Sequence, residues 1–117
     1  MVFLHISFDL DADIYGDGKK LDADMIASTF PIEMAEEMAK LPGLIWKLWT
    51  SQAEECKADG FYLFSTREDA ENRAAFAKKA FPRVPGLSNV KTEIHDVMED
   101  LSRVTRAPID LPANPSL

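Results

Sequence analysis

Two periodic patterns run along this chain, one with the period of a β-strand and one with the period of an α-helix. Every second residue from Val2 to Phe8 is apolar, which gives that stretch one strongly apolar face. Two aromatic, β-prone runs then flank a short charged connection, as in an antiparallel hairpin. A fourth run alternates near the end of the chain. The predicted strands are Val2–Phe8, Gly43–Thr50, Gly60–Ser65 and Asn89–Met98.

Two helices are predicted between these strands. Pro31 suits the first turn of a helix that ends where Pro42-Gly43 turns the chain. The second helix opens with a pair spaced like a capping box and runs to about Phe81. The capping pair is either Ser65 with Glu68 or Thr66 with Asp69. The expected buried face of this helix comprises Ala70, Ala74, Ala77 and Phe81.

The order β-α-β-β-α-β predicts an α+β fold of the ferredoxin-like type. Right-handed crossovers and hairpin adjacency place the strands in one four-stranded antiparallel sheet with both helices on one face. We expect a single domain over residues 1–109 and a C-terminal tail over 110–117. The segment Asp22–Phe30 adds a helical turn or two, and Glu99–Leu117 forms an arm over this domain or a neighbour, with a frayed end.

The aromatic hairpin places large side chains on both faces of the predicted sheet. Simple alternation puts Leu44, Trp46 and Leu48 on one side of the first hairpin strand and Ile45 and Trp49 on the other. The helices can cover one face. The opposite face, with Phe3 and His5, is too aromatic to remain exposed to solvent. We therefore expect a second copy to cover it, which makes a homodimer with a dimeric α/β barrel.

Composition and charge narrow the range of partners. The chain has 117 residues, enough for one domain with its own core, and a net charge of −7. Such acidity argues against nucleic acid and anionic membranes, because lysine and arginine supply most phosphate affinity. No signal peptide or membrane-spanning stretch is visible, so we expect a soluble cytoplasmic protein whose partners are a second copy and a small molecule.

The acidic loop Asp9–Asp22 has some of the spacing of a calcium-binding loop. The loop offers two frames for this motif, one that starts at Asp9 and one that starts at Asp11. Each fails, because apolar or basic residues stand at the positions of ligands or of the required glycine, and a strand leads in. A solvated loop is the better interpretation, with Tyr15 available to cap a pocket.

The hairpin and its surroundings resemble a known family. Pro42-Gly43-Leu44-Ile45-Trp46-Lys47-Leu48-Trp49-Thr50, the later Gly60-Phe61-Tyr62-Leu63-Phe64 and the segment Thr105-Arg106-Ala107-Pro108 are similar to the YdhR-like putative mono-oxygenase family. The resemblance covers roughly Val2 to Ile109. It implies a dimeric α+β barrel and a cofactor-independent mono-oxygenase, an oxidoreductase acting on a hydroxylated or quinol-like aromatic. The chain departs from the family pattern in its long acidic loop, at Asp59, and at Ser65-Thr66 and Arg73.

A mono-oxygenase of this kind must bind an electron-rich aromatic, remove a proton and shield the product from water. We expect Trp46, Trp49 and Phe64 to bind the substrate. Tyr62 is the candidate hydrogen-bond donor to a substrate hydroxyl, and His5 and His95 are the candidate proton acceptors near neutral pH. The competing interpretation makes these aromatics core and dimer interface.

Several alternatives stay open at this point. His5 and His95 lie on neighbouring predicted strands, and Glu93 is a candidate third ligand for a metal site there, although a structural role for each histidine is the better interpretation. The rival function is a non-catalytic dimeric barrel that binds a small apolar ligand or acts as an interaction module. A lyase or isomerase on the same scaffold is a third possibility.

Overall fold

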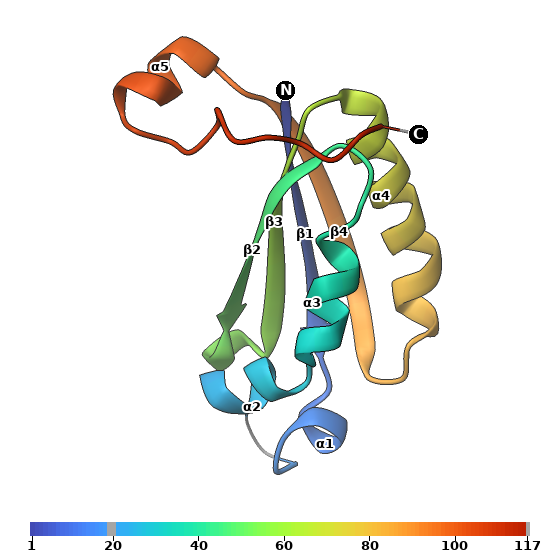
Figure 1. Ribbon diagram of the computed structural model, residues 1–117. Coiled ribbons are helices and arrows are strands. Elements are labelled where there is room, and N and C mark those ends of the chain that lie inside the picture. The colour runs from blue at the N-terminus through green and yellow to red at the C-terminus, as the bar shows by residue number, and fades with distance from the viewer. Residues whose placement is uncertain (19–20, 117) are drawn as a thin grey trace.

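The computed structural model describes residues 1–18 and 21–116 and has the predicted α+β architecture. Positions 19 and 20 of the acidic loop and position 117 at the end of the tail lie outside the described residues. Four antiparallel strands form one sheet in the order β2-β3-β1-β4, with helices over one face (Figure 1). The strands are β1 (Val2–Leu10), β2 (Leu44–Gln52), β3 (Lys57–Phe64) and β4 (Leu87–Asp96). The helices are α1 (Ala12–Tyr15), α2 (Ala23–Ser28), α3 (Ile32–Met38), η1 (Ala53–Glu55), α4 (Arg67–Ala80), η2 (Phe81–Arg83) and α5 (Glu99–Val104).

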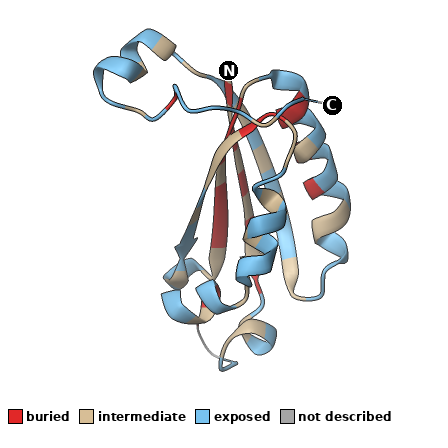
Figure 2. Cartoon of the chain, viewed as in Figure 1, coloured by how far each residue is buried: buried red, intermediate tan, exposed pale blue. Residues whose placement is uncertain are grey.

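The core lies between the sheet and α4 (Figure 2). In β1 every second residue from Val2 to Leu10 is buried, so the predicted face does meet the helices. Tyr62 and Phe64 of β3 are 1% exposed on the same side. In α4, Ala70, Ala74 and Ala77 are buried, as their helical spacing predicts. The small side chains let this helix pack close to the sheet.

The start of α4 confirms one of the two predicted capping pairs. Thr66 is the N-cap, and its hydroxyl oxygen accepts a hydrogen bond from the backbone N–H of Asp69. The same hydroxyl donates to the Asp69 carboxylate at 2.8 Å. Ser65 is not the cap. The capping interaction fixes the point at which the chain leaves β3 and begins its return over the sheet.

A register shift in β2 corrects the predicted division of the hairpin between the two faces. Leu44 pairs with Phe64 and Trp46 pairs with Leu63, so β2 has one extra residue, Ile45, between these pairs. Leu44 therefore belongs to the helix-side core, whereas Trp46 and Leu48 lie on the opposite face. Beyond the shift the alternation resumes, and it turns Lys47 and Trp49 toward the helices.

The terminal segments contain more structure than the sequence pattern predicts. Residues after β4 form α5, which projects beyond the sheet. The tail then returns past the start of β2 and ends near the start of α4 (Figure 1). Asn114 exchanges backbone hydrogen bonds with Gly43 and Leu44 and donates from its side chain to the carbonyls of Ala39 and Leu41. The arm thus lies over its own domain. Within residues 1–18 and 21–116, no helix is both long and apolar enough to cross a membrane.

Candidate functional site

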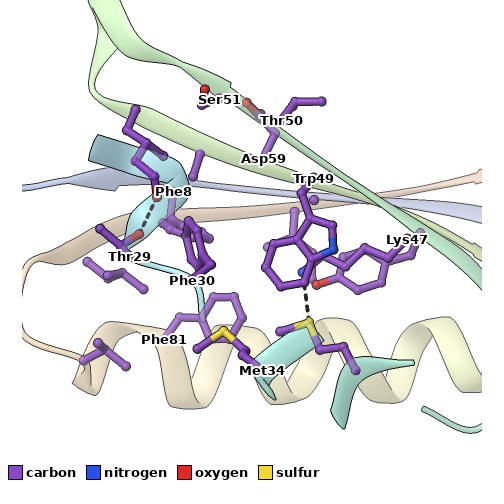
Figure 3. Close-up of a pocket in the computed structure, with 18 of the residues that line it drawn as sticks. Phe8, Thr29, Phe30, Met34, Lys47, Trp49, Thr50, Ser51, Asp59 and Phe81 are labelled. Carbon is purple, nitrogen blue, oxygen red and sulfur yellow. Dashed lines mark hydrogen bonds between the residues drawn. The ribbon is translucent and has the colours of Figure 1, made fainter. Parts of the chain in front are cut away.

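A cavity of about 560 Å³ lies between the helix-side face of the sheet and helices α2, α3 and α4. Its volume is in the range of sites for small organic ligands. Side chains from β1, β2, β3 and from the helices point into the same space (Figure 3). Its lining includes Phe8, Tyr15, Phe30, Met34, Met38, Lys47, Trp49, Tyr62, Arg73, Phe76 and Phe81.

Seven of the described residues that line this cavity are aromatic. Phe8 of β1 makes edge contacts with Phe30 and Phe81, with ring centroids 6.3 and 5.6 Å apart. Phe30 in turn lies 5.5 Å from the ring of Trp49. Tyr15 closes one end, and its hydroxyl donates a 2.7 Å hydrogen bond to the carbonyl of Pro85. The cavity is therefore shaped for a flat, mainly apolar ligand.

Helix α3 forms the outer wall and is the least buried part of the site. None of its residues is buried, and Met34 and Met38 are its side chains toward the cavity. Its N-cap, Pro31, has no side chain that can cap the helix. Helix α3 therefore contacts the rest of the site through flexible methionine side chains and not through a buried helix face.

Lys47 brings an amino group into this aromatic space. Its Nζ lies 3.4 Å from the ring centroid of Trp49 and 4.7 Å from that of Tyr62. Within the described residues, the only hydrogen-bond acceptor that this Nζ contacts is the sulfur of Met38, at 3.0 Å. Burial lowers the pKa of Lys47 to about 7, and the positive charge of Arg73 acts in the same direction. A sizeable fraction of the amine is therefore neutral at physiological pH.

Arg73 of α4 is the second cation at the cavity. Its guanidinium carbon lies 4.9 Å from the ring centroid of Phe76 and 5.7 and 5.8 Å from those of Phe81 and Tyr62. Nη2 is 3.8 Å from the Met38 sulfur, and the buried Nε has no hydrogen-bond partner in the part of the chain that the structure describes. A guanidinium stays protonated at any physiological pH, so this charge is permanent.

Tyr62 places its ring between these cations and the core. The residue is almost fully buried, and burial raises the pKa of its phenol, while the charge of Arg73 opposes that rise. The phenol therefore remains protonated at neutral pH and is available as a hydrogen-bond donor.

The structure divides the six residues expected to form the site between three places. Trp49 and Tyr62 line the cavity. Phe64 lies in the core behind the cavity, stacked on Tyr62 with ring centroids 5.9 Å apart. His5, His95 and Trp46 are on the other face of the sheet, because alternation along β1, β4 and β2 turns them away from the helices. The six do not share one pocket, which corrects the single aromatic slot drawn from the sequence.

The two histidines take separate carboxylate partners on that outer face. The ring of His5 stacks on Phe61 at 4.4 Å, and its Nε2 lies 2.9 Å from Oδ1 of the buried Asp59. Nε2 of His95 is 3.2 Å from the Glu93 carboxylate, on an exposed part of β4. Trp46 donates from Nε1 to the carbonyl of Pro108 at 2.9 Å. Among the described residues, no group of three or more potential metal ligands is assembled.

Sequence reasoning missed Lys47 and Arg73, although both left a signal. Lys47 interrupts an otherwise apolar strand, so it has to face either a core or an interface. Arg73 falls at the position i+3 from Ala70 and i−4 from Ala77, and therefore on the buried face of its helix. A charged residue at an apolar position of a periodic pattern is the feature that identifies them.

Proteins of known structure share this fold. A putative antibiotic biosynthesis monooxygenase from Deinococcus radiodurans is 10% identical, with a TM-score of 0.59 over 85% of this chain and 94% of that one. An uncharacterized NIPSNAP-like domain protein from Burkholderia xenovorans is 17% identical, with a TM-score of 0.53 over 97% of this chain and 92% of that one. At these identities the likeness concerns the fold alone.

The comparison with sequence families is more specific. No curated protein matches the sequence significantly. The family model described as "Putative mono-oxygenase ydhR" matches residues 4–108 and therefore spans the sheet, the cavity and α5. The resemblance drawn from the hairpin is thus confirmed, and the chain belongs to the ydhR putative mono-oxygenase family.

Proposed function

We propose that this protein is a cofactor-independent mono-oxygenase that oxidises a small phenolic or quinol-type aromatic in the helix-side cavity, with Lys47 as the proton acceptor. Family membership supports the reaction class, and the aromatic cavity supports the substrate class. The observation that carries the proposal is the position of Lys47 Nζ over the Trp49 ring, inside the cavity and without a carboxylate partner among the described residues.

The role of proton acceptor passes from the histidines to Lys47 because of geometry. A general base must come within hydrogen-bonding distance of the proton that it removes. The sheet separates His5 and His95 from the cavity, whereas the side chain of Lys47 points into the cavity. The lowered pKa of Lys47 keeps part of the amine unprotonated near pH 7, which suits a base that works at that pH.

The chemical step follows from these groups. The neutral amine of Lys47 takes the proton of the substrate phenol and becomes an ammonium, and the ammonium and the Arg73 guanidinium stabilise the phenolate. The electron-rich ring then reduces O₂. One oxygen atom forms a new C–O bond at the ring carbon. The other leaves as water, with the hydrogen that the ring carbon loses and the proton that the Lys47 ammonium gives back. A phenol plus O₂ gives a quinone plus water, so the substrate supplies all the electrons.

Oxygen uptake with a panel of hydroquinones and fused-ring phenols tests this proposal in metal-free buffer. We expect uptake with one or more of them, and a loss of about 10²- to 10⁴-fold in kcat for Lys47→Met, the usual range for removal of a general base. Lys79→Met, an exposed lysine on α4, is the matched control and should behave as the parent protein.

The same assay separates the competing functions. Tight binding of a panel member without oxygen uptake would favour the ligand-binding barrel, and turnover that persists without oxygen would favour a lyase or isomerase. Uptake that is unchanged in Lys47→Met would refute the role of Lys47. A pH profile of kcat/KM that rises through about pH 7 in the parent, and loses that rise in the variant, would support the role.

We also propose that the protein forms a homodimer through the outer face of the sheet. Phe3, Trp46 and Phe61 cluster there, with Phe3 5.7 Å from Phe61 and 6.5 Å from Trp46. A groove beside this cluster continues to α5, where Met98, Leu101 and Val104 are 72%, 67% and 79% exposed. A two-fold axis would bring this patch against itself and remove it from water.

Sedimentation equilibrium tests the assembly. The parent protein should sediment as a dimer at micromolar concentration, and Leu101→Asp should shift it toward monomer because the change places a charge in the apolar interface. Ala75→Asp, on an exposed position of α4, is the control. A parent protein that stays monomeric at high concentration would refute the proposed dimer.

A further inference from the structure

We infer that the cavity selects aromatic substrates that carry a carboxylate, and that Arg73 is the residue that binds this carboxylate. For turnover the inference rests on the proposed function, since the phenol oxygen of the same substrate would face Lys47. The substrate class is then a hydroxyaromatic carboxylate. The binding preference for a carboxylate does not depend on the proposed reaction, because it is argued only from the arrangement of charges in the cavity.

The first observation is that two positive charges share an aromatic cavity without a counter-ion. The chain carries 20 acidic residues against 13 basic ones. In the part of the chain that the structure describes, no carboxylate lies within ion-pair distance of Lys47 or Arg73, although other lysines and arginines are paired, such as Lys57 with Asp9 and Arg103 with Asp110. A permanently charged guanidinium without a carboxylate partner, beside a second basic group in a mostly apolar space, favours an anionic ligand.

The second observation is that the nearby carboxylates are turned elsewhere. Asp69 precedes Arg73 by four residues on α4, a spacing that favours a helical ion pair. Its carboxylate is instead occupied by the hydroxyls of Thr66 and Ser116, at 2.8 and 2.5 Å. Glu37 lines the mouth of the cavity, but it pairs with Lys40 at 3.3 Å and is largely exposed. Arg73 thus has no carboxylate partner among the described residues.

The third observation concerns the present partner of both cations. Lys47 Nζ and Arg73 Nη2 approach the same sulfur, that of Met38, at 3.0 and 3.8 Å. A thioether is a weak acceptor and a poor partner for a charged donor. Met38 belongs to α3, the wall without buried residues, so its side chain can move at little cost. A carboxylate that replaced the sulfur beside Arg73 would accept charge-assisted hydrogen bonds of about 2.8 Å from the guanidinium and leave the Lys47 amine to the phenol.

The surroundings of Arg73 favour a carboxylate on a flat ring system over other anions. The guanidinium lies among the rings of Tyr62, Phe76 and Phe81. Its planar fork matches the two oxygens of a carboxylate. The aromatic wall suits the ring that carries the carboxylate.

Calorimetric titration with 2-naphthoate and with its neutral isostere 2-naphthamide tests the inference. Neither probe has a phenol, so binding is measured without turnover. We expect the parent protein to bind the carboxylate about 10- to 100-fold more tightly than the amide, the usual value of a hydrogen bond to a charged group. Arg73→Met should reduce the affinity for naphthoate by a similar factor and leave that for naphthamide nearly unchanged. Arg73→Lys should retain part of the preference.

Lys79→Met removes one positive charge from the exposed side of the same helix and should leave the preference intact. Equal affinity of the parent protein for the two probes would overturn the inference without the need for any variant. A preference that survives in a folded Arg73→Met protein would overturn the role of Arg73. Selective naphthoate binding in a protein that consumes no oxygen with any hydroxyaromatic carboxylate would refute the proposed function and support the inference.

Discussion

The buried amine of Lys47 should make the stability of this protein rise with pH, and replacement by methionine should remove that rise. The pKa of Lys47 falls from an ordinary 10.5 to about 7 in the folded state. Between these two values the unfolded chain binds a proton that the folded chain does not bind. The free energy of unfolding therefore increases with pH across this interval, by about 1.4 kcal/mol for each pH unit.

The size of the effect follows from the difference between the two pKa values. A shift of this size corresponds to about 5 kcal/mol in total, and about 3 kcal/mol of it falls between pH 7 and pH 9.5. Below pH 7 both states are protonated and the destabilisation is complete. Above the ordinary lysine pKa both are neutral and it vanishes. The range should stop at pH 9.5 because the raised pKa of Tyr62 makes stability fall once the unfolded phenol ionises near pH 10.

Urea denaturation followed by circular dichroism, at half-unit steps from pH 6 to pH 9.5, measures this dependence. The informative quantity is the difference between the parent protein and Lys47→Met, because contributions from all other groups cancel. The groups that face Lys47, namely Tyr62 and Arg73, and Glu37 at the mouth, are present in both proteins. We expect Lys47→Met to be the more stable protein at pH 7 and the advantage to shrink as pH rises.

Lys79→Met provides the control, since an exposed lysine should show no such difference. Parallel stability curves for the parent protein and Lys47→Met over the whole range would refute the reasoning. That result would mean that the Lys47 amine is hydrated in the folded state and that its charge costs nothing there.

Three further predictions concern the scaffold. Leu4 is completely buried, so Leu4→Ala should lower the free energy of unfolding by about 2–5 kcal/mol in urea, and a loss below about 1 kcal/mol would contradict its central position. Thr66→Ala removes the cap of α4 and should cost about 1 kcal/mol, measured in the same way, whereas Thr66→Asp should restore most of it. Gly43 has a φ of +72°, and a Cβ there would lie 2.2 Å from the Asp69 carboxylate, so Gly43→Ala should lower the Tm by several degrees; an unchanged Tm would refute this.

The architecture was predictable because its signals are local and redundant. Alternation in β1, three alanines at helical spacing in α4 and the Thr66–Asp69 pair each indicate the same arrangement, and the structure confirms them. The sequence pattern did not predict the short helices that have no buried residues. Neither α1, with four residues, nor α5, with six, has a buried residue, so neither leaves a periodic signal.

The site was harder to predict because it depends on which face each side chain takes. The extra residue Ile45 in β2 changes the face of Leu44 relative to Trp46, and nothing in the apolar pattern marks that register shift. Trp46 and Trp49 are three residues apart and take opposite faces, but the sequence does not indicate which face holds the pocket. The sheet separates Trp46, His5 and His95 from Trp49 and Tyr62, so the expected grouping of these residues is wrong for that reason. The pairing of Lys47 with Arg73 also lay beyond the sequence, because it requires the distance between a strand and a helix that are far apart in the chain.

The unequal anchoring of α3 determines how a ligand can reach the cavity. The C-terminal end of this helix leads into a turn that Asn114 holds through four hydrogen bonds, whereas its N-terminal end follows Pro31 with no side-chain cap. Local unfolding starts where buried contacts are fewest, so it should begin at Ile32 and stop at the turn. Exchange of ligand with solvent then requires only a few residues to fray, while the β-sheet and the carboxylate-binding helix stay folded throughout.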